Sequence, residues 1–159
     1  MSRNPYVEES SVFLHIDGTL KTIVKQRTPI ARILGKESSY YIDRQGVKMP
    51  LSNNYSARVL LVFGMEEEEN RKEIVALVNL ILEDDFLKKE LVGIRKLDIN
   101  EYQFSVRSGN HTIDFGKLIN IDVKFMKLKA FYNKAFLDKT IQEYKTINLK
   151  FHNQVVCTK

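Results

Sequence analysis

Residues 92–116 read VGIRKLDINEYQFSVRSGNHTIDFG. This stretch divides into three segments that are rich in apolar residues and have the length of β-strands: VGIRKLDI, EYQFSVRS and HTIDFG. The second and third segments are separated by Ser108, Gly109 and Asn110, and these residue types favour turns. The stretch therefore predicts three strands, of which the last two form a hairpin.

Two helical segments flank these strands. In the first, five apolar residues follow the i, i+3, i+4, i+7 and i+8 spacing of one helical face: Ile74, Leu77, Val78, Ile81 and Leu82. The acidic run 66–69 suits the start of this helix better than it suits a cation site. A second helix is expected from about Ile121 to Asp138, with Asn120 or Asp122 as its cap. Five residues are expected to face inward: Phe125, Leu128, Phe131, Tyr132 and Phe136.

Before the first helix, the pattern is that of strands. SSVFLHIDGTLKTIVKQRTP (residues 10–29) predicts a hairpin around Asp17 and Gly18 that ends at Pro29. SSYYIDRQGVKMPL predicts another, with Asp43 and Gly46 at the first and fourth positions of a type I turn. ARVLLVFG is a continuous apolar run, consistent with a strand buried on both faces.

The chain closes with YKTINLKFHNQVVCTK (residues 144–159). Apolar and polar residues alternate from Ile147 to His152, which predicts a strand with one buried face. We expect residues 146–151 to pair with residues 155–157 as the terminal hairpin of the sheet. The fold class is thus α+β, a mostly antiparallel sheet with two amphipathic helices packed on it. Such a terminal strand leaves one edge free for an extended peptide to join.

Composition and charge limit the classes of function and partner that the chain can have. The chain has 159 residues, of which 43% are hydrophobic, and its apolar runs are shorter than the roughly 20 residues that span a bilayer. From Lys117 onward, the chain has nine lysines, no arginine and three acidic residues, which gives this part a charge of +6. The residues before Lys117 carry −1, and the total is +5. The lysines are scattered and Arg is absent, which argues against nucleic acid and favours an acidic partner.

No catalytic motif was found, so we expect no enzyme activity, no cofactor and no catalytic metal. His15, His111 and His152 stand far apart, each in or beside an expected strand, and are interpreted as surface or half-buried residues rather than metal ligands. Cys157 has no neighbour that would lower its pKa. The alternative, an unrecognised hydrolase, requires a pocket that gathers His111, Asp114 and Asp43.

Two stretches of the sequence resemble a known family: VKQRTPIARI (residues 24–33) and YYIDRQGVKMPLS (residues 40–52). This pair resembles the FtsQ/DivIB bacterial cell-division family, in which a charged residue, a Pro and a small residue end the POTRA domain and a Tyr-Ile-Asp-x-x-Gly turn opens the β domain. HTIDFG, VKFMKLKAFY and INLKF resemble later motifs of the family in the same order. The C-terminal sequence FHNQVVCTK (residues 151–159) is most similar to that of family members from Bacteroidetes.

The resemblance implies a domain organisation. Residues 1–31 correspond to the C-terminal half of a POTRA domain, and residues 32–159 to the FtsQ-type β domain. Arg27, Pro29 and Ala31 form the expected joint between them, ordered and extended before the proline. The resemblance also implies that the full-length protein is held in the inner membrane by a helix absent from this chain, with this portion in the periplasm.

The resemblance further implies a non-catalytic scaffold that recruits FtsB and FtsL to the division site, with FtsB adding as a strand at the C-terminal sheet edge. The family's partner-binding positions correspond to Leu149, Lys150, Phe151 and Asn153. Lys150 stands where the family has an Arg, and HNQ replaces a turn containing glycine. Phe151 could instead belong to the core. A POTRA-type outer-membrane assembly or secretion partner is the other alternative, although it would need tandem POTRA units.

Overall fold

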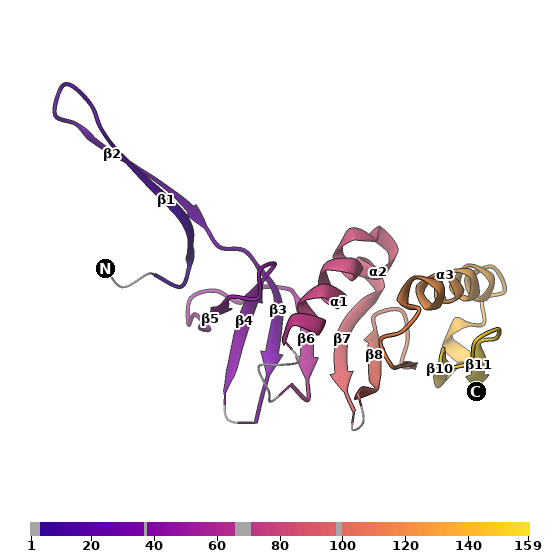
Figure 1. The fold of residues 1–159 in the computed structure, drawn as a ribbon. Coiled ribbons are helices and arrows are strands. Elements are labelled where there is room, and N and C mark those ends of the chain that lie inside the picture. Colours follow the sequence, from indigo (N-terminus) through magenta and orange to yellow (C-terminus); the bar gives the residue numbers. More distant parts are fainter. Residues whose placement is uncertain (1–3, 37, 66–70, 98–99) are drawn as a thin grey trace.

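The computed structural model describes residues 4–36, 38–65, 71–97 and 100–159 (Figure 1). One mixed sheet of nine strands has the order β11-β10-β9-β8-β7-β6-β3-β4-β5, and β1 (Val7–Leu14) pairs with β2 (Leu20–Gln26) in a separate hairpin. The expected α+β class is confirmed. The strands of the sheet are β3 (Pro29–Leu34), β4 (Ser39–Asp43), β5 (Lys48–Met49), β6 (Leu60–Phe63), β7 (Leu91–Lys96), β8 (Tyr102–Val106), β9 (Thr112–Gly116), β10 (Thr146–Asn148) and β11 (Val156–Thr158).

The α-helices that the structure describes lie over the same face of the sheet (Figure 1). They are α1 (Arg71–Glu83), α2 (Asp85–Glu90) and α3 (Ile121–Leu137), and a short 3₁₀ helix, η2 (Ile141–Glu143), follows α3. α1 and α2 connect β6 to β7, and α3 connects β9 to β10; both pairs of strands are parallel. A parallel pair needs such a crossover, whereas the antiparallel β7-β8-β9 meander needs only short turns.

The core lies between this sheet face and the helices. Four fully buried residues lie opposite one another on the neighbouring strands β7, β8, β9 and β10: Ile94, Phe104, Ile113 and Ile147. The ring of Phe115 lies 4.8 Å from that of Phe104. Alternate residues of each strand thus meet the helices, as the period of two in the sequence predicts.

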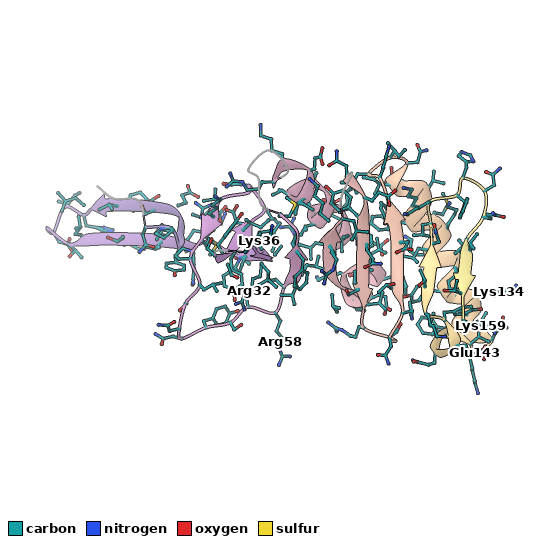
Figure 2. The ribbon with its side chains drawn as sticks, turned by 90° about the horizontal axis from the view of Figure 1, so that it is seen from below. Arg32, Lys36, Arg58, Lys134, Glu143 and Lys159 are labelled. Atoms are coloured by element: carbon teal, nitrogen blue, oxygen red, sulfur yellow. The ribbon has the colours of Figure 1, made fainter. Side chains whose placement is uncertain are left out.

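One strand differs from the expectation. The run ARVLLVFG was expected to be buried on both faces, but in β6 only Leu60 and Val62 are buried, while Leu61 is exposed. The expectation is wrong because the helices cover one face of the sheet only, and Figure 2 shows the uncovered face from below. Phe136 is likewise exposed rather than inward-facing.

The helix boundaries show a further difference. α2 is missing from the sequence expectation, and it begins because the side-chain Oδ1 of Asp84 accepts the backbone N–H groups of Phe86 and Leu87 (3.0 and 3.1 Å). At the start of α3, Asn120 occupies the cap position with a left-handed backbone and makes no side-chain cap bond. The acidic run 66–69 lies outside the described residues.

The β1–β2 hairpin projects away from the sheet (Figure 1). It is held at its base by an ion pair between Arg27 and Asp43, whose side chains are both nearly buried. Arg27 also donates to the carbonyl of Val7 (3.2 Å). The Asp43 carboxylate accepts the backbone N–H of Gln45 and of Val47, and so belongs to the β4–β5 turn as well. One carboxylate therefore joins the hairpin to the first turn of the sheet.

Replacing Arg27 with methionine would leave the Asp43 carboxylate buried without its cation. Because truncating one partner of a buried ion pair costs about 3–5 kcal/mol, we expect Arg27→Met to lower the free energy of unfolding by that order. Urea denaturation followed by circular dichroism measures it. The control is Lys25→Met on the same hairpin, whose exposed pair with Glu8 (3.1 Å) should contribute less than about 1 kcal/mol. Equal losses in both variants would contradict a special role for the buried pair.

Candidate functional site at the terminal sheet edge

The C-terminal edge of the sheet is formed by β10 and β11. β10 runs parallel to β9, with Ile147 opposite Ile113, and β11 returns antiparallel to β10, with Cys157 opposite Ile147. β11 stands last in the strand order, and no other described strand lies beyond it. An edge strand carries N–H and C=O groups without a partner strand, so this short edge can accept an extended peptide.

β10 ends earlier than expected. The alternating pattern predicts a strand through Phe151, but the strand ends at Asn148. The side-chain Oδ1 of Asn148 accepts a hydrogen bond from the backbone N–H of Lys150 (2.9 Å), and this contact turns the chain. The N–H of Leu149 still donates to the carbonyl of Asp114 (2.9 Å), and its side chain is fully buried. Leu149 therefore fixes the segment to the core and does not present its side chain at the surface.

The turn moves Phe151 out of the core. Its side chain is 47% exposed, although Ile147 and Leu149 precede it in the same alternating pattern. The Nζ of Lys127, on α3, donates to the carbonyls of Phe151 (2.6 Å) and His152 (3.3 Å). The connection between β10 and β11 is thus tied to α3 while the aromatic ring faces solvent. Asn153 is exposed in the same connection.

Lys150 is held within the chain. Its Nζ lies 2.5 Å from the Oε2 of Glu101, in a half-exposed ion pair. Its aliphatic stem covers Gly116, where an added Cβ would lie 2.9 Å from the Lys150 Cγ. Gly116 also has a φ of +73°, which side chains rarely adopt, so the backbone conformation favours glycine there. A partner carboxylate that binds Lys150 has to compete with Glu101.

The last residues are fixed by charges. Lys159 forms an ion pair with Glu143, and Figure 2 shows both at the end of the molecule where the sheet terminates. The Nζ of Lys145 donates to the carbonyl of Lys159 (3.2 Å). Burial raises the pKa of the Cys157 thiol, which keeps it protonated and unsuited to act as a nucleophile.

The three residues that an unrecognised hydrolase requires do not share a pocket. His111 lies beneath α3, where its Nε2 is 2.5 Å from the Tyr132 hydroxyl. Asp114 accepts from the side chain of Gln103 (2.9 Å), and Asp43 lies at the base of the hairpin. A pocket of about 310 Å³ at that base includes Asp43 among its lining residues and neither of the others.

The histidines also lie apart from one another. His15 is in the loop of the projecting hairpin, His111 is buried, and His152 is exposed beside Asn153. Within the described ranges, no group of three or more His, Cys, Asp or Glu side chains could hold a metal ion.

A buried polar cluster around His111 was not found from sequence. Glu90, at the end of α2, accepts hydrogen bonds from the backbone N–H (3.3 Å) and the hydroxyl of Ser108. Burial raises the pKa of the nearby Tyr132 hydroxyl, and the Glu90 charge acts in the same direction. Burial also lowers the pKa of His111, which stays neutral. Nothing in the local pattern marks these residues, because they come from separate elements.

The joint residues occupy the base of the hairpin. Pro29 and Ala31 belong to β3, so only residues 27–28 connect the hairpin to the sheet. The backbone N–H of Arg27 donates to the carbonyl of Tyr6 (2.8 Å), in addition to the ion pair with Asp43. In the adjacent turn, the N–H of Gly46 donates to the carbonyl of Asp43 (3.0 Å).

Two comparisons relate the chain to known proteins. A family model described as "FtsQ/DivIB, C-terminal related" matches residues 28–158. The curated "Cell division protein FtsQ" of Salinibacter ruber (strain DSM 13855 / M31) is 25% identical over an alignment 178 residues long, which covers 98% of this chain and 66% of that relative's length. None of the helices in the described part of the chain is long and apolar enough to cross a bilayer.

The lowered pKa of His111 predicts a pH dependence of stability. Below the ordinary histidine pKa of about 6.5, His111 binds a proton in the unfolded chain but stays neutral in the folded chain. The free energy of unfolding therefore falls as the pH falls from 7.5 to 5.5. We expect His111→Gln to reduce this loss, as measured by urea denaturation at both pH values. His152→Gln, at an exposed site, should leave the loss unchanged. A loss of the same size in His111→Gln as in the parent would refute the assignment.

Proposed function

The chain belongs to the FtsQ/DivIB C-terminal-related family, and from this membership we propose that it is the partner-binding portion of a non-catalytic division scaffold. Its partners are FtsB and FtsL, and a segment of FtsB adds as a strand along β11. The observation that carries this proposal is the position of β11 at the end of the strand order, with no other described strand beyond it. Strand addition draws its affinity from main-chain hydrogen bonds and its specificity from alternate side chains.

The side chains near the edge have separate roles in this proposal. Phe151 is the aromatic anchor in this proposal. Its large apolar side chain belongs to the β10–β11 connection and faces solvent because of the turn at Asn148. Lys150 exchanges Glu101 for a carboxylate of the partner, and the exposed Asn153 lies beside the added strand. Leu149 acts indirectly, since its buried side chain holds the connection on the core.

We further propose that residues 1–31 are the C-terminal half of a POTRA domain and that residues 32–159 form the β domain. One face of the β1–β2 hairpin supports this, because Val12, Leu14, Leu20 and Val24 are all exposed there. Apolar side chains of a two-stranded sheet need a cover, and the remainder of a POTRA domain would supply it. In the full-length protein, a membrane helix outside this chain anchors it in the inner membrane, and this portion lies in the periplasm.

The Phe151→Ala variant tests the partner site. If the ring is an anchor, its truncation should weaken binding by about 2 kcal/mol or more, roughly thirtyfold. The measurement is isothermal titration calorimetry with the periplasmic part of the FtsB from the same species. Because Phe151 lies outside the core, the melting temperature should stay near that of the parent.

A matched control separates a specific contact from a general loss of apolar surface. Phe13, on the projecting hairpin, is 50% exposed and far along the chain from the terminal edge, so Phe13→Ala should bind FtsB as the parent does. Lys150→Glu should also weaken binding, since it places a negative charge where the proposal requires a positive one. Parental affinity in both Phe151→Ala and Lys150→Glu would rule out this edge as the FtsB site.

A further inference from the structure

Helix α3 is apolar on two opposite sides. Its inner side is buried against the sheet and carries Phe125, Leu128, Tyr132 and Ala135. Its outer side is exposed and yet carries large apolar residues, among them Met126 at 62% and Leu137 at 83% exposed. The inner side is accounted for by the core. The outer side has no covering element among the described residues.

Exposed residues on the outer side of α3, most of them apolar, follow a regular spacing. Intervals of three, four, three and four residues separate the members of one row, which we call the α3 seam: Val123, Met126, Ala130, Asn133 and Leu137. All five are exposed. This alternation is the a/d heptad spacing by which two helices pack side by side. The seam is about 21 Å long at about 1.5 Å per residue, which suits one short partner helix.

The other long helix does not share this property. On α1 the exposed residues are mostly charged or small, and Leu80, at 39%, is the one large apolar residue exposed there. The seam is therefore a feature of α3 and not a general consequence of helices that cover one face of the sheet. Its row also includes Asn133, and a single polar residue in such a row specifies the register of a helix pair.

Lysines border the seam along one side. Lys127 and Lys134 each follow a seam residue directly, at the position that selects partners by charge in paired helices. Lys127 donates to two neutral carbonyls, and Lys134 has no ion-pair partner among the described residues. Figure 2 shows Lys134 at the same end of the molecule as Lys159. Lys129, on the other side, is already neutralised by Asp84 (2.5 Å).

These charges distinguish between possible occupants. A second copy packed antiparallel on the seam would set lysine against lysine along this border, which is unfavourable. Helices that lie on a lipid surface have a broad apolar face. The seam is one row wide and contains Asn133, and its other flank carries Asp122, Lys129 and a single exposed aromatic residue, Phe136. A helix with carboxylates along its flank satisfies both the apolar row and the lysines.

We propose that the α3 seam is a docking site for one amphipathic helix of another protein, with apolar residues facing the seam and acidic residues facing Lys127 and Lys134. The seam lies on α3 and not on β11, but the two surfaces share Lys127, whose ammonium group also holds the connection that precedes β11. The seam spans two heptads, so the contact is weak and reversible. An acidic helix is the partner chemistry to which the basic C-terminal part of the chain is complementary.

The test uses a fluorescently labelled synthetic helix with Leu at the positions that face the seam and Glu at the flanking positions. A second helix with Lys in place of Glu is the charge-reversed probe. By fluorescence anisotropy, we expect the Glu helix to bind at least about tenfold more tightly than the Lys helix, a difference of about 1.4 kcal/mol. Raising the salt concentration should weaken the preference.

Variants of exposed residues locate the site without disturbing the fold. Met126→Lys should weaken binding of the Glu helix by about tenfold or more, and Lys134→Glu should shift the preference toward the Lys helix. Leu80→Lys on α1 is the matched control and should bind as the parent does, as should Phe151→Ala. Circular dichroism checks that each variant keeps its helix content.

Four results would overturn the proposal. The first is that the Glu helix fails to bind, and the second is that both helices bind equally well at low salt. The third is self-association of the parent that Met126→Lys abolishes in sedimentation velocity, which would make the seam an interface between copies. The fourth is binding to phosphatidylglycerol vesicles that Met126→Lys abolishes, which would assign the seam to a lipid surface.

Discussion

The parallel pairing of β10 with β9 is the constraint on which the C-terminal part of the structure depends. Two parallel neighbours cannot be joined by a tight turn, so the chain has to cross over the sheet between them, and α3 is that crossover. Ile147 and Leu149 hold β10 on the core, since both side chains are fully buried. The pairing places β11 at the end of the sheet, and so it creates the free edge.

A second constraint acts at the other end of the sheet. The Asp43 carboxylate accepts backbone hydrogen bonds within its own turn and also pairs with Arg27 at the base of the hairpin. A charged pair with little solvent access is costly to separate, so the direction of the hairpin is coupled to the conformation of the β4–β5 turn. This coupling holds the hairpin and the sheet at one angle without a large interface between them.

Lys127 connects the two proposed surfaces at the C-terminal end. Its backbone lies in α3 beside the seam, and its ammonium group holds the carbonyls of Phe151 and His152 in the connection that precedes β11. The position of the Phe151 ring therefore depends on a residue of the neighbouring surface. Neither the exposed edge nor the exposed seam is explained by the needs of the core, since the core is complete without them.

Sequence patterns were enough to predict the fold class and most of the elements, although not α2. Alternation and helical spacing record which side of each segment is buried, and turn residues record where segments end. The sequence predicted the hairpin across Ser108–Asn110, nearly the whole of α3 and the position of the terminal hairpin. Tertiary structure alone decided that Arg27 pairs with Asp43, that Leu61 and Phe136 are exposed, and that Phe151 leaves the core. The Arg27–Asp43 pair depends on a contact between residues far apart in the chain, and the exposure of Leu61 and Phe136 depends on which surfaces other elements leave uncovered. A local pattern contains neither. Phe151 leaves the core at a turn made by the side chain of Asn148, and the alternation of apolar and polar residues does not record that turn.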